Sequence, residues 1–293
     1  MAGNRFRLQG GLGNQLFIYY AAANYAIAKK QDFITFDVSG LGQASTERSF
    51  ELSKFDLPIK YEVSESRIPR LVRAILTRIN RFLPAISRSL GYFQPTEIGF
   101  NAELLKGKYF EISGYFQSWR YPEEVKNIFP KHSLIATPAS SWAQSKILEA
   151  KSYNPILCHV RRGDFLKLQE TFGVLSYEYY LNAIDELKSR GVQGPVWVMT
   201  DSPTEISPEF LDKANAELIL EPPNTIPTDT FAVMQACNAF ILSNSTFSWW
   251  AAFSSHASNV IAPEPWFKSM AEPIDLIPLT WIRIKSSWNS NGR

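Results

Sequence analysis

The segment that decides the fold class is residues 6–38, FRLQGGLGNQLFIYYAAANYAIAKKQDFITFDV. It begins with a short alternating run and turns on the glycines of GGLGNQ. Apolar residues at helical spacing follow, and Lys29 and Lys30 suit the carboxyl end of that helix. The run DFITFDV at 32–38 predicts the next strand. A strand, a helix and a second strand in this order favour a parallel sheet.

The second half of the chain repeats this alternation, which predicts a doubly wound nucleotide-binding domain. We place the boundary between two domains near residue 152, and the last segment is a candidate for packing back on the first domain. The predicted strands are 156–160, 196–199, 216–220, 239–242 and 259–263, and the predicted helices are 139–151, 176–191, 228–238 and 246–257.

Composition excludes several classes of protein. A net charge of +2 is too small to indicate a nucleic-acid partner. Three histidines and two cysteines at scattered positions predict no metal cluster. Cys158 and Cys237 lie in apolar segments and are interpreted as reduced core thiols rather than a disulfide. With no secretory signal and no apolar run of about 18 residues, we expect a cytoplasmic protein, at most peripheral to a membrane.

Residues 61–95 form a basic amphipathic pattern that is broken at Pro84. One interpretation is a solvated helix that packs on one face. The other is a membrane-surface patch over 67–88 that makes peripheral contact with the inner membrane surface, as basic amphipathic helices do. The sequence leaves both open. The arginines of the pattern are Arg67, Arg70, Arg73, Arg78, Arg81 and Arg88.

Polar side chains follow three of the predicted strands at the point where each strand ends. Parallel strands would bring these side chains into one crevice, where ligands of such sheets bind. They are His159, Arg161, Arg162 and Asp164 after the first strand, Thr200, Asp201 and Ser202 after the second, and Ser243, Asn244, Ser245, Thr246 and Ser248 after the fourth.

Arg161 and Arg162 suit a phosphate or carboxylate ligand, since a guanidinium group gives bidentate, charge-assisted hydrogen bonds. The alternative is a structural salt bridge with Asp164. The loop at 243–250, SNSTFSWW, joins a strand to a helix, so free backbone N–H groups there favour an anion. The alternative for this loop is that Ser245 or Thr246 merely caps the helix.

Two further features of these loops have open interpretations. Trp249 and Trp250 follow the loop inside the helix, and we expect them to pack against the sheet rather than touch a ligand. In GGLGNQ, Asn14 and Gln15 form either a third polar site or a helix cap. A basic pair, a hydroxyl-rich helix start and no metal cluster together suggest a diphosphate held without metal, which a nucleotide-sugar transferase needs.

Four segments, GGLGNQLF, GYFQSWRY, HVRRGDF and MQACNAFILSNSTFSWWAAF, occur in this order and closely resemble the bacterial α-1,2-fucosyltransferases. The resemblance runs from about Leu8 to Trp281. It implies a GT-B type α/β fold with two Rossmann-like domains facing a central cleft. Residues 1–152 would form the acceptor-side domain and residues 153–293 the GDP-sugar-binding domain.

The activity that the resemblance implies is inverting, metal-independent transfer of L-fucose from GDP-fucose. The acceptor would be the 2-hydroxyl of a terminal galactose, or a similar hexose, of a glycan. No cofactor and no metal would be required beyond the donor substrate. Bacterial relatives act on O-antigen repeat units or host-like glycans, and the sequence does not decide between such acceptors.

The resemblance also implies roles for single residues. Arg161 would hold the diphosphate, His159 would fix the guanine side, and Asp229, sixteen residues before Ser245, would read guanine. Asn14 would face the fucose or the acceptor. The implied donor-binding residues are His159, Arg161, Asp201, Asp229, Ser243, Asn244, Ser245 and Thr246, and the implied catalytic residues are Asp164, Arg161 and Asn14.

The general base is open at this stage. Asp164 is one candidate and Glu170 is another, while relatives that use a glutamate after the motif align it with Gln169. Asp164 could instead orient a neighbouring arginine, and a loose transition state needs only late proton removal. A transferase for another GDP-hexose and a non-catalytic glycan- or nucleotide-binding protein on the same fold are the alternative functions.

Overall fold

The computed structural model describes residues 4–43, 49–65, 68–130, 133–273 and 275–289, without the side chains at 42, 43, 164 and 167. The chain divides into two compact units. Unit 1 comprises Met1–Leu134 with Pro273–Leu276, and unit 2 comprises Ile135–Glu272 with Ile277–Arg293. This division falls earlier than residue 152, because the helix that begins at Ser141 packs within unit 2. No helix in the described part of the chain is long and apolar enough to cross a membrane.

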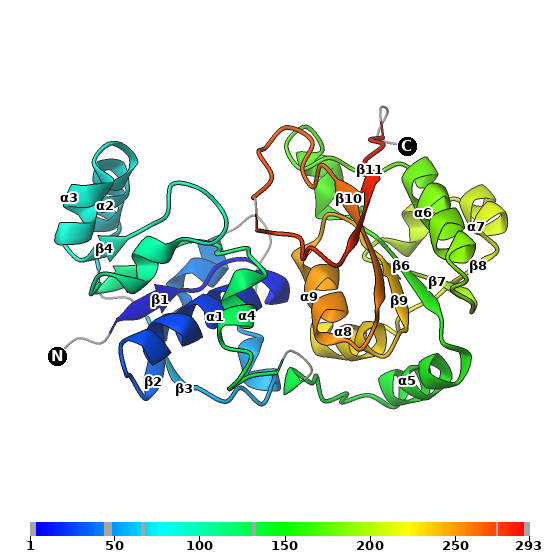
Figure 1. Ribbon diagram of the computed structural model, residues 1–293, viewed down its shortest axis with the longest axis horizontal. Helices are drawn as coiled ribbons and strands as arrows, with labels where there is room; N and C mark the ends of the chain where they lie inside the picture. The colour runs from blue at the N-terminus through cyan, green and yellow to red at the C-terminus, as the bar shows by residue number, and fades with distance from the viewer. Residues whose placement is uncertain (1–3, 44–48, 66–67, 131–132, 274, 290–293) are drawn as a thin grey trace. The chain divides into compact units, whose positions relative to one another are not determined.

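Unit 1 is built on a parallel sheet with the strand order β3-β2-β1-β5-β4 (Figure 1). The order changes direction between β1 and β5, so the polar turns after these two strands leave the sheet at one place. The elements are β1 (Arg5–Arg7), α1 (Leu12–Ala28), β2 (Phe33–Asp37), β3 (Lys60–Ser64), α2 (Arg70–Phe82), α3 (Pro84–Ser89), β4 (Tyr92–Phe93), β5 (Glu111–Ile112) and α4 (Arg120–Glu124).

The two faces of the unit 1 sheet differ in polarity. Phe6 and Phe36 point toward the almost completely buried helix α1, where their rings meet those of Tyr25 and Tyr19. Asp37 of β2 and Glu111 of β5 point to the other face, and their carboxylates are fully buried. Helix α2 supplies the countercharge for this polar face, as described below.

Unit 2 has the strand order β8-β7-β6-β9-β10-β11, again parallel throughout the described strands. Numbered within the unit, this is the 3-2-1-4-5-6 order of a dinucleotide-binding fold, with its switch point between β6 and β9. The elements are α5 (Ser141–Tyr153), β6 (Ile156–Val160), α6 (Tyr177–Ser189), β7 (Val196–Thr200), α7 (Pro208–Ala214), β8 (Ala216–Leu218), α8 (Pro227–Gln235), β9 (Ala239–Ile241), α9 (Thr246–Ser254), β10 (Asn259–Glu264) and β11 (Ile282–Lys285).

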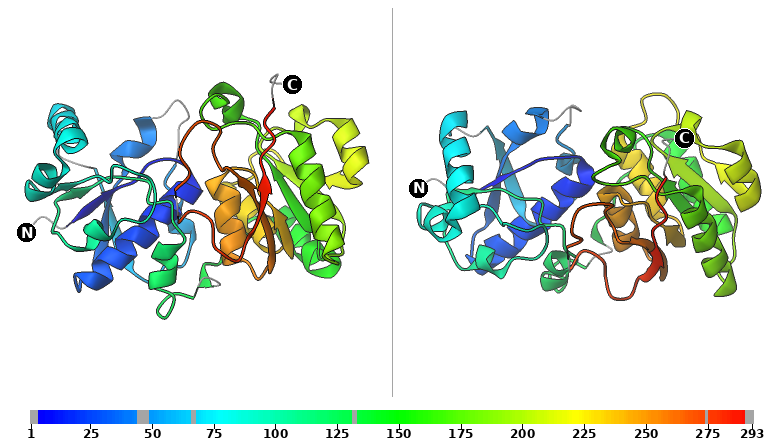
Figure 2. Two further views of the ribbon diagram at one scale, coloured as in Figure 1. Left: turned by 45° about the horizontal axis from the view of Figure 1, so that its top comes forward. Right: turned by 90° about the horizontal axis from the view of Figure 1, so that it is seen from above.

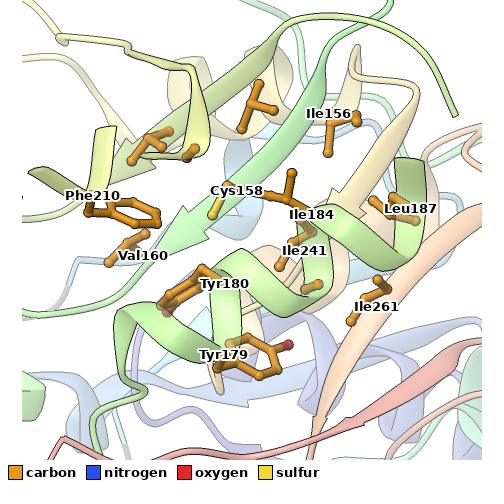
Figure 3. Packing of buried hydrophobic residues seen from close by; sticks show 14 of the residues in the cluster. Ile156, Cys158, Val160, Tyr179, Tyr180, Ile184, Leu187, Phe210, Ile241 and Ile261 are labelled. Carbon is orange, nitrogen blue, oxygen red and sulfur yellow. The ribbon is translucent and has the colours of Figure 1, made fainter. Parts of the chain in front are cut away.

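Helices cover both faces of the unit 2 sheet (Figures 1 and 2). Cys158 and Val160 of β6 point into a core formed with α6 and α7, where they lie near Tyr180 and Ile184 (Figure 3). His159, between them, points to the opposite face, where its ring lies 6.4 Å from that of Phe247 on α9. The alternation along β6 therefore sends Cys158 and Val160 to one helical layer and His159 to the other.

The predicted two-unit α/β architecture with parallel sheets is confirmed, while several elements were missed. The helical pattern of 61–95 begins only at Arg70, and its first residues form β3 instead. The pattern ends one helix and starts another at Pro84, as predicted. The short strands β4 and β11 and helix α7 were not predicted, since two to seven residues are too few for a clear period.

Candidate active site

The loops after β6 and β9 meet at the switch point of the unit 2 sheet. Nδ1 of His159, near the end of β6, lies 2.8 Å from Oγ of Ser243, which follows β9. Both side chains are buried. One hydrogen bond thus joins the HVRRGDF and SNSTFSWW segments, which are more than 80 residues apart in the chain.

His159 is neutral at physiological pH. Burial lowers the pKa of its imidazole to about 3, and the positive charge of Arg161 adds to the shift. The imidazole therefore contributes a hydrogen-bonding group and no charge. Beside it, the positive charge of the loop resides on the two arginines.

Arg161 and Asp201 connect the ends of β6 and β7. Nη1 of Arg161 lies 3.1 Å from Oδ2 of Asp201, and both side chains are partly exposed. The backbone N–H of Arg162 donates to Oδ1 of the same aspartate at 2.9 Å. Gly163 permits this approach, because a Cβ atom at that position would overlap the Asp201 carboxylate. Asp201 is therefore a salt-bridge partner of Arg161.

Arg162 has a different environment from its neighbour. Its side chain is buried, donates to the carbonyl oxygen of Leu175 at 2.7 Å, and lies over the ring of Tyr177. These contacts tie the loop after β6 to the start of α6. The arginine pair thus separates into a partly exposed residue, Arg161, and a buried structural residue, Arg162.

The start of α9 carries the hydroxyl-rich residues of the third loop. Ser245 occupies the N-cap position with extended backbone, and within the described residues its side chain makes no capping hydrogen bond. The simple capping role is therefore absent for Ser245. Asn244 is buried and donates to the carbonyl oxygens of Phe172 and Gly173, so this residue of the predicted donor set holds a neighbouring loop.

Trp249 and Trp250 are fully buried, as expected of residues that pack in the core. The Trp249 ring stacks on Phe253 and lies 5.4 Å from the ring of Trp281. Cys158 and Cys237 are buried free thiols, which confirms the prediction that they form no disulfide.

Asp229 lies in the first turn of α8, away from the β6 loop in the chain. Its two carboxylate oxygens accept hydrogen bonds from the backbone N–H groups of Ala139, at 2.7 Å, and Ser140, at 3.1 Å. The side chain is buried. In this structure Asp229 fixes the entry to helix α5, and its predicted contact with guanine stays a prediction.

Asn14 lies in unit 1, in the first turn of α1. Its Oδ1 accepts a hydrogen bond from Nε2 of Gln117 at 2.9 Å. Gly10 has a positive φ, and a Cβ there would overlap the Asn14 side chain, so the glycine turn is shaped around this asparagine. Asn14 and Gln117 follow β1 and β5 respectively, at the switch point of the unit 1 sheet. Gln15 is buried and bonds to backbone atoms of Gly10 and Ser49.

The two base candidates are not equivalent. The side chain of Asp164 lies outside the described residues, although its backbone begins a short 3₁₀ helix, Asp164–Leu168. Glu170 is highly exposed and forms an ion pair with Lys268 at 3.2 Å. Among the described residues, no group of three or more His, Cys, Asp or Glu side chains is placed to hold a metal ion.

A sequence model of glycosyl transferase family 11 matches residues 5–283. The chain belongs to this family. Family 11 membership makes the protein a glycosyltransferase, and the predicted resemblance to bacterial α-1,2-fucosyltransferases agrees with it.

The relatives of this family 11 chain are named for the transfer of different sugars. An "alpha-1,2-colitosyltransferase" of Escherichia coli is 28% identical over 292 residues, which cover 95% of this chain and 98% of the relative. A "galactoside alpha-(1,2)-fucosyltransferase 1" of Leontocebus fuscicollis is 26% identical, with 62% of this chain and 54% of the relative covered.

A crystal structure of the fucosyltransferase NodZ from Bradyrhizobium resembles the family 11 chain in fold. The TM-score is 0.50 at 16% sequence identity, and the match covers 87% of this chain and 94% of NodZ. The GT-B type assignment of the two parallel-sheet units is thereby confirmed.

Three residues in contact with candidate residues of unit 1 or unit 2 were not predicted from the sequence. Gln117 lies in GYFQSWRY, which was quoted for its resemblance without a role, and its contact with Asn14 spans 103 residues. Gly163 was visible as the glycine of HVRRGDF, a signal of close approach. Phe247, beside His159, had no signal of its own among so many aromatic residues.

Proposed function

We propose that this family 11 glycosyltransferase is inverting and metal-independent and moves L-fucose from GDP-fucose to the 2-hydroxyl of a terminal galactose, or a similar hexose, in a glycan. The observation that carries the proposal is the junction of the HVRRGDF and SNSTFSWW loops through His159 and Ser243. It puts the guanidinium group of Arg161 and the start of α9 at one switch point of a nucleotide-binding sheet.

The chemistry needs positive charge where the leaving group gains electrons. The acceptor oxygen attacks C1 of fucose from the face opposite the nucleotide, and the bond from C1 to the phosphate oxygen breaks. GDP leaves with the electron pair, and the acceptor hydroxyl gives up its proton to a base. Arg161 and the free N–H groups of α9 would stabilise the growing charge on the diphosphate, a task that a metal ion performs in other enzymes.

The partial exposure of Arg161 supports Arg161, rather than the buried Arg162, as the residue that binds the diphosphate. A diphosphate can approach a side chain that lies at the surface of the loop, whereas Arg162 is buried against Leu175 and Tyr177. Asp201 would orient Arg161 through their ion pair. His159, being neutral, would hold the nucleotide by hydrogen bonding and packing without competing for its charge.

The acceptor side would be formed by unit 1. Asn14, held by Gln117, would contact the fucose or the acceptor sugar. Asp164 is our candidate for the general base. Glu170 is the weaker candidate, since its exposed carboxylate already pairs with Lys268.

A second donor is favoured by one specific finding, the colitosyltransferase relative that matches nearly the whole chain. Colitose is L-fucose without the 3-hydroxyl group. A site that hydrogen-bonds the 3-hydroxyl would discriminate against GDP-colitose by roughly 10⁴-fold, while a site that merely accommodates it would discriminate by about 10²-fold or less. The ratio of kcat/KM for the two donors therefore separates these functions.

The test of the proposal is calorimetric titration with GDP in the presence of EDTA. We expect the unaltered protein to bind, and Arg161→Ala to bind poorly and to lose at least about 100-fold in turnover of GDP-fucose, the size typical of one transition-state charge partner. Arg190→Ala, which removes an exposed arginine from the end of α6, is the matched control and should leave both values unchanged.

Three outcomes would count against the proposal. Absence of GDP binding by the folded protein would refute a GDP-sugar donor. Binding that appears only when Mg²⁺ replaces EDTA would refute metal independence. Near-normal turnover by Arg161→Ala would refute the diphosphate role of this residue.

A further inference from the structure

Helix α2 has its polarity inverted relative to an ordinary surface helix. The residues that it buries are Arg73, Leu76 and Asn80. The residues that it exposes include Leu71, Ile75 and Phe82, whose spacings of four and seven residues place them on one stripe. These three side chains are 73%, 50% and 68% exposed.

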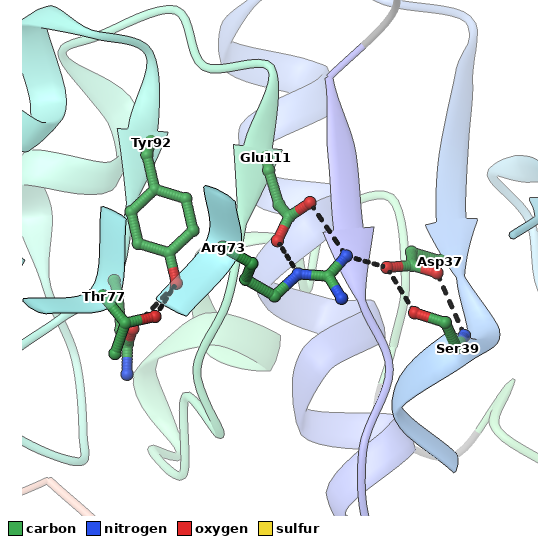
Figure 4. Close-up of polar contacts among 7 residues, drawn as sticks. Asp37, Ser39, Arg73, Thr77, Tyr92 and Glu111 are labelled. Atoms are coloured by element: carbon green, nitrogen blue, oxygen red, sulfur yellow. Dashed lines mark hydrogen bonds and ion pairs between the residues drawn. The ribbon is translucent and has the colours of Figure 1, made fainter. Parts of the chain in front are cut away.

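The cause of the inversion is the polar face of the unit 1 sheet. The Arg73 guanidinium group lies between two buried carboxylates, with Nε 2.7 Å from Glu111 and Nη2 3.0 Å from Asp37 (Figure 4). Thr77, one turn further on, lies 3.1 Å from the hydroxyl of Tyr92. Because polar contacts anchor α2 to the sheet, its apolar stripe is left pointing outward.

Helix α3 continues the exposed apolar surface. Leu83, Ile86 and Leu90 are spaced by three and four residues, which is also a helical spacing, and are 48% to 53% exposed. Six large exposed apolar side chains on two consecutive helices and their cap residues exceed the scattered exposure that a soluble surface shows, and exposed apolar surface of this extent marks an interaction site.

The positive charge of residues 66–96 indicates which kind of partner this surface binds. Residues 66–96 contain six arginines and no aspartate or glutamate. Arg70, Arg78 and Arg81 are exposed on α2, whereas Arg73 is buried and Arg67 lies outside the described residues. A second copy of this chain would bring two such basic faces together, and like charges oppose that contact.

A groove beside α2 combines the two properties. Its volume is about 830 Å³, and its walls include Ile75, Phe82 and Pro95 together with Arg78 and Arg81. An anionic phospholipid has the matching chemistry, a phosphate next to an acyl chain, and helices with arginines beside an apolar stripe lie in membrane interfaces.

We propose that α2 and α3 dock this protein on an anionic lipid surface. Leu71, Ile75 and Phe82 enter the boundary between headgroups and acyl chains, and Leu83, Ile86 and Leu90 extend the inserted surface. Arg78 and Arg81 contact the lipid phosphates. This inference does not depend on the identity of the donor or acceptor sugar.

The test is flotation of the full chain with phosphatidylcholine vesicles, with and without phosphatidylglycerol. We expect binding to the anionic vesicles. Leu71→Ser, Ile75→Ser and Phe82→Ser combined should lower the affinity about 100-fold, at about five-fold for each exposed side chain. The matched control combines Ile135→Ser, Leu148→Ser and Leu220→Ser, which alter comparably exposed residues of unit 2, and it should bind normally.

The arginines are tested separately. Arg78→Gln with Arg81→Gln should weaken binding to anionic vesicles about 25-fold, since each basic residue at such a surface contributes about five-fold. Arg190→Gln is the control. Near-ultraviolet circular dichroism establishes that each variant is folded, independently of any enzymatic assay.

Several results would overturn the proposal. Failure of the wild-type protein to bind either kind of vesicle would overturn it. Equal losses of vesicle affinity in the α2 variant and in its unit 2 control would also overturn it. Light scattering that reveals a dimer dissolved by the α2 substitutions, without vesicle binding, would instead assign this face to contact between two copies.

Discussion

The buried state of His159 predicts a specific pH dependence of the stability of unit 2. In the unfolded chain its imidazole has the ordinary pKa of 6.5, whereas burial and the charge of Arg161 lower the folded value to about 3. Between these values the unfolded chain binds the extra proton. Stability contributed by the neutral imidazole is therefore complete above pH 6.5 and is lost as the pH falls toward 3.

The size of the effect follows from proton linkage. Each pH unit within this window costs about 1.4 kcal/mol, so lowering the pH from 7 to 5 should cost about 2 kcal/mol through His159 alone. His159→Asn removes the titrating group and keeps a polar atom near the position of Nδ1, where Ser243 is bonded. The variant should therefore lose less stability over this pH range, even if it is less stable at pH 7.

Urea unfolding followed by tryptophan fluorescence is the suitable assay. Seven of the eight tryptophans, all except Trp119, belong to unit 2, so the signal reports the unit that contains His159. His256→Asn removes an exposed histidine and serves as the matched control. If His159→Asn keeps the full pH dependence of the parent, the imidazole is not buried in its neutral form and its assigned role in holding the nucleotide without charge fails.

Two more predictions concern unit 1. Arg73→Ala removes the guanidinium group that two buried carboxylates share, and it should lower the free energy of unfolding by about 3–5 kcal/mol. Arg78→Ala, on the exposed side of α2, should change the free energy of unfolding by less than about 0.5 kcal/mol. Hydrogen exchange in β2 and β5 measures both effects, and equal effects would contradict the role of Arg73 in holding α2 on the sheet. Gln117→Ala removes the hydrogen bond to Asn14 and should lower kcat for glycosyl transfer about 10-fold while GDP affinity is unchanged. Steady-state kinetics and calorimetry check this against Gln144→Ala on the exposed face of α5, and a parallel loss of GDP affinity would contradict a role on the acceptor side.

The parts of the site that follow strand ends could be predicted, because each depends on a local signal. An apolar run followed by charged or hydroxylated residues marks a strand and its loop, and parallel pairing then brings the loops together. The contacts of His159 with Ser243 and of Arg161 with Asp201 follow from that logic. The family resemblance added the proposed donor, GDP-fucose, which the spacing alone does not contain.

The contacts that were not predicted join distant segments without a local signal. Asp229 lies in the first turn of α8, where a carboxylate interacts favourably with the helix dipole, so its position in the sequence does not indicate a further role. Its hydrogen bonds with the backbone of Ala139 and Ser140 depend on how the chain enters α5. The contact between Asn14 and Gln117 depends on β1 and β5 being neighbours. Strand order, unlike strand position, is a property of the whole sheet.

Helix α2 shows why an amphipathic pattern does not by itself tell which face is buried. The same amphipathic sequence is compatible with a helix that buries its apolar stripe and with a helix that buries its polar side, since it has one face of each kind. The decision depends on the surface beneath, and β1, β2 and β5 alternate so that one sheet face is apolar and the other is charged. Because α1 already covers the apolar face, the charged face is the one left for α2, and only Arg73 among its arginines reaches both carboxylates. Because the charged face of the sheet buries Arg73, the apolar stripe of α2 lies on the outer side of the helix. The lipid-binding proposal follows from the burial of this one residue.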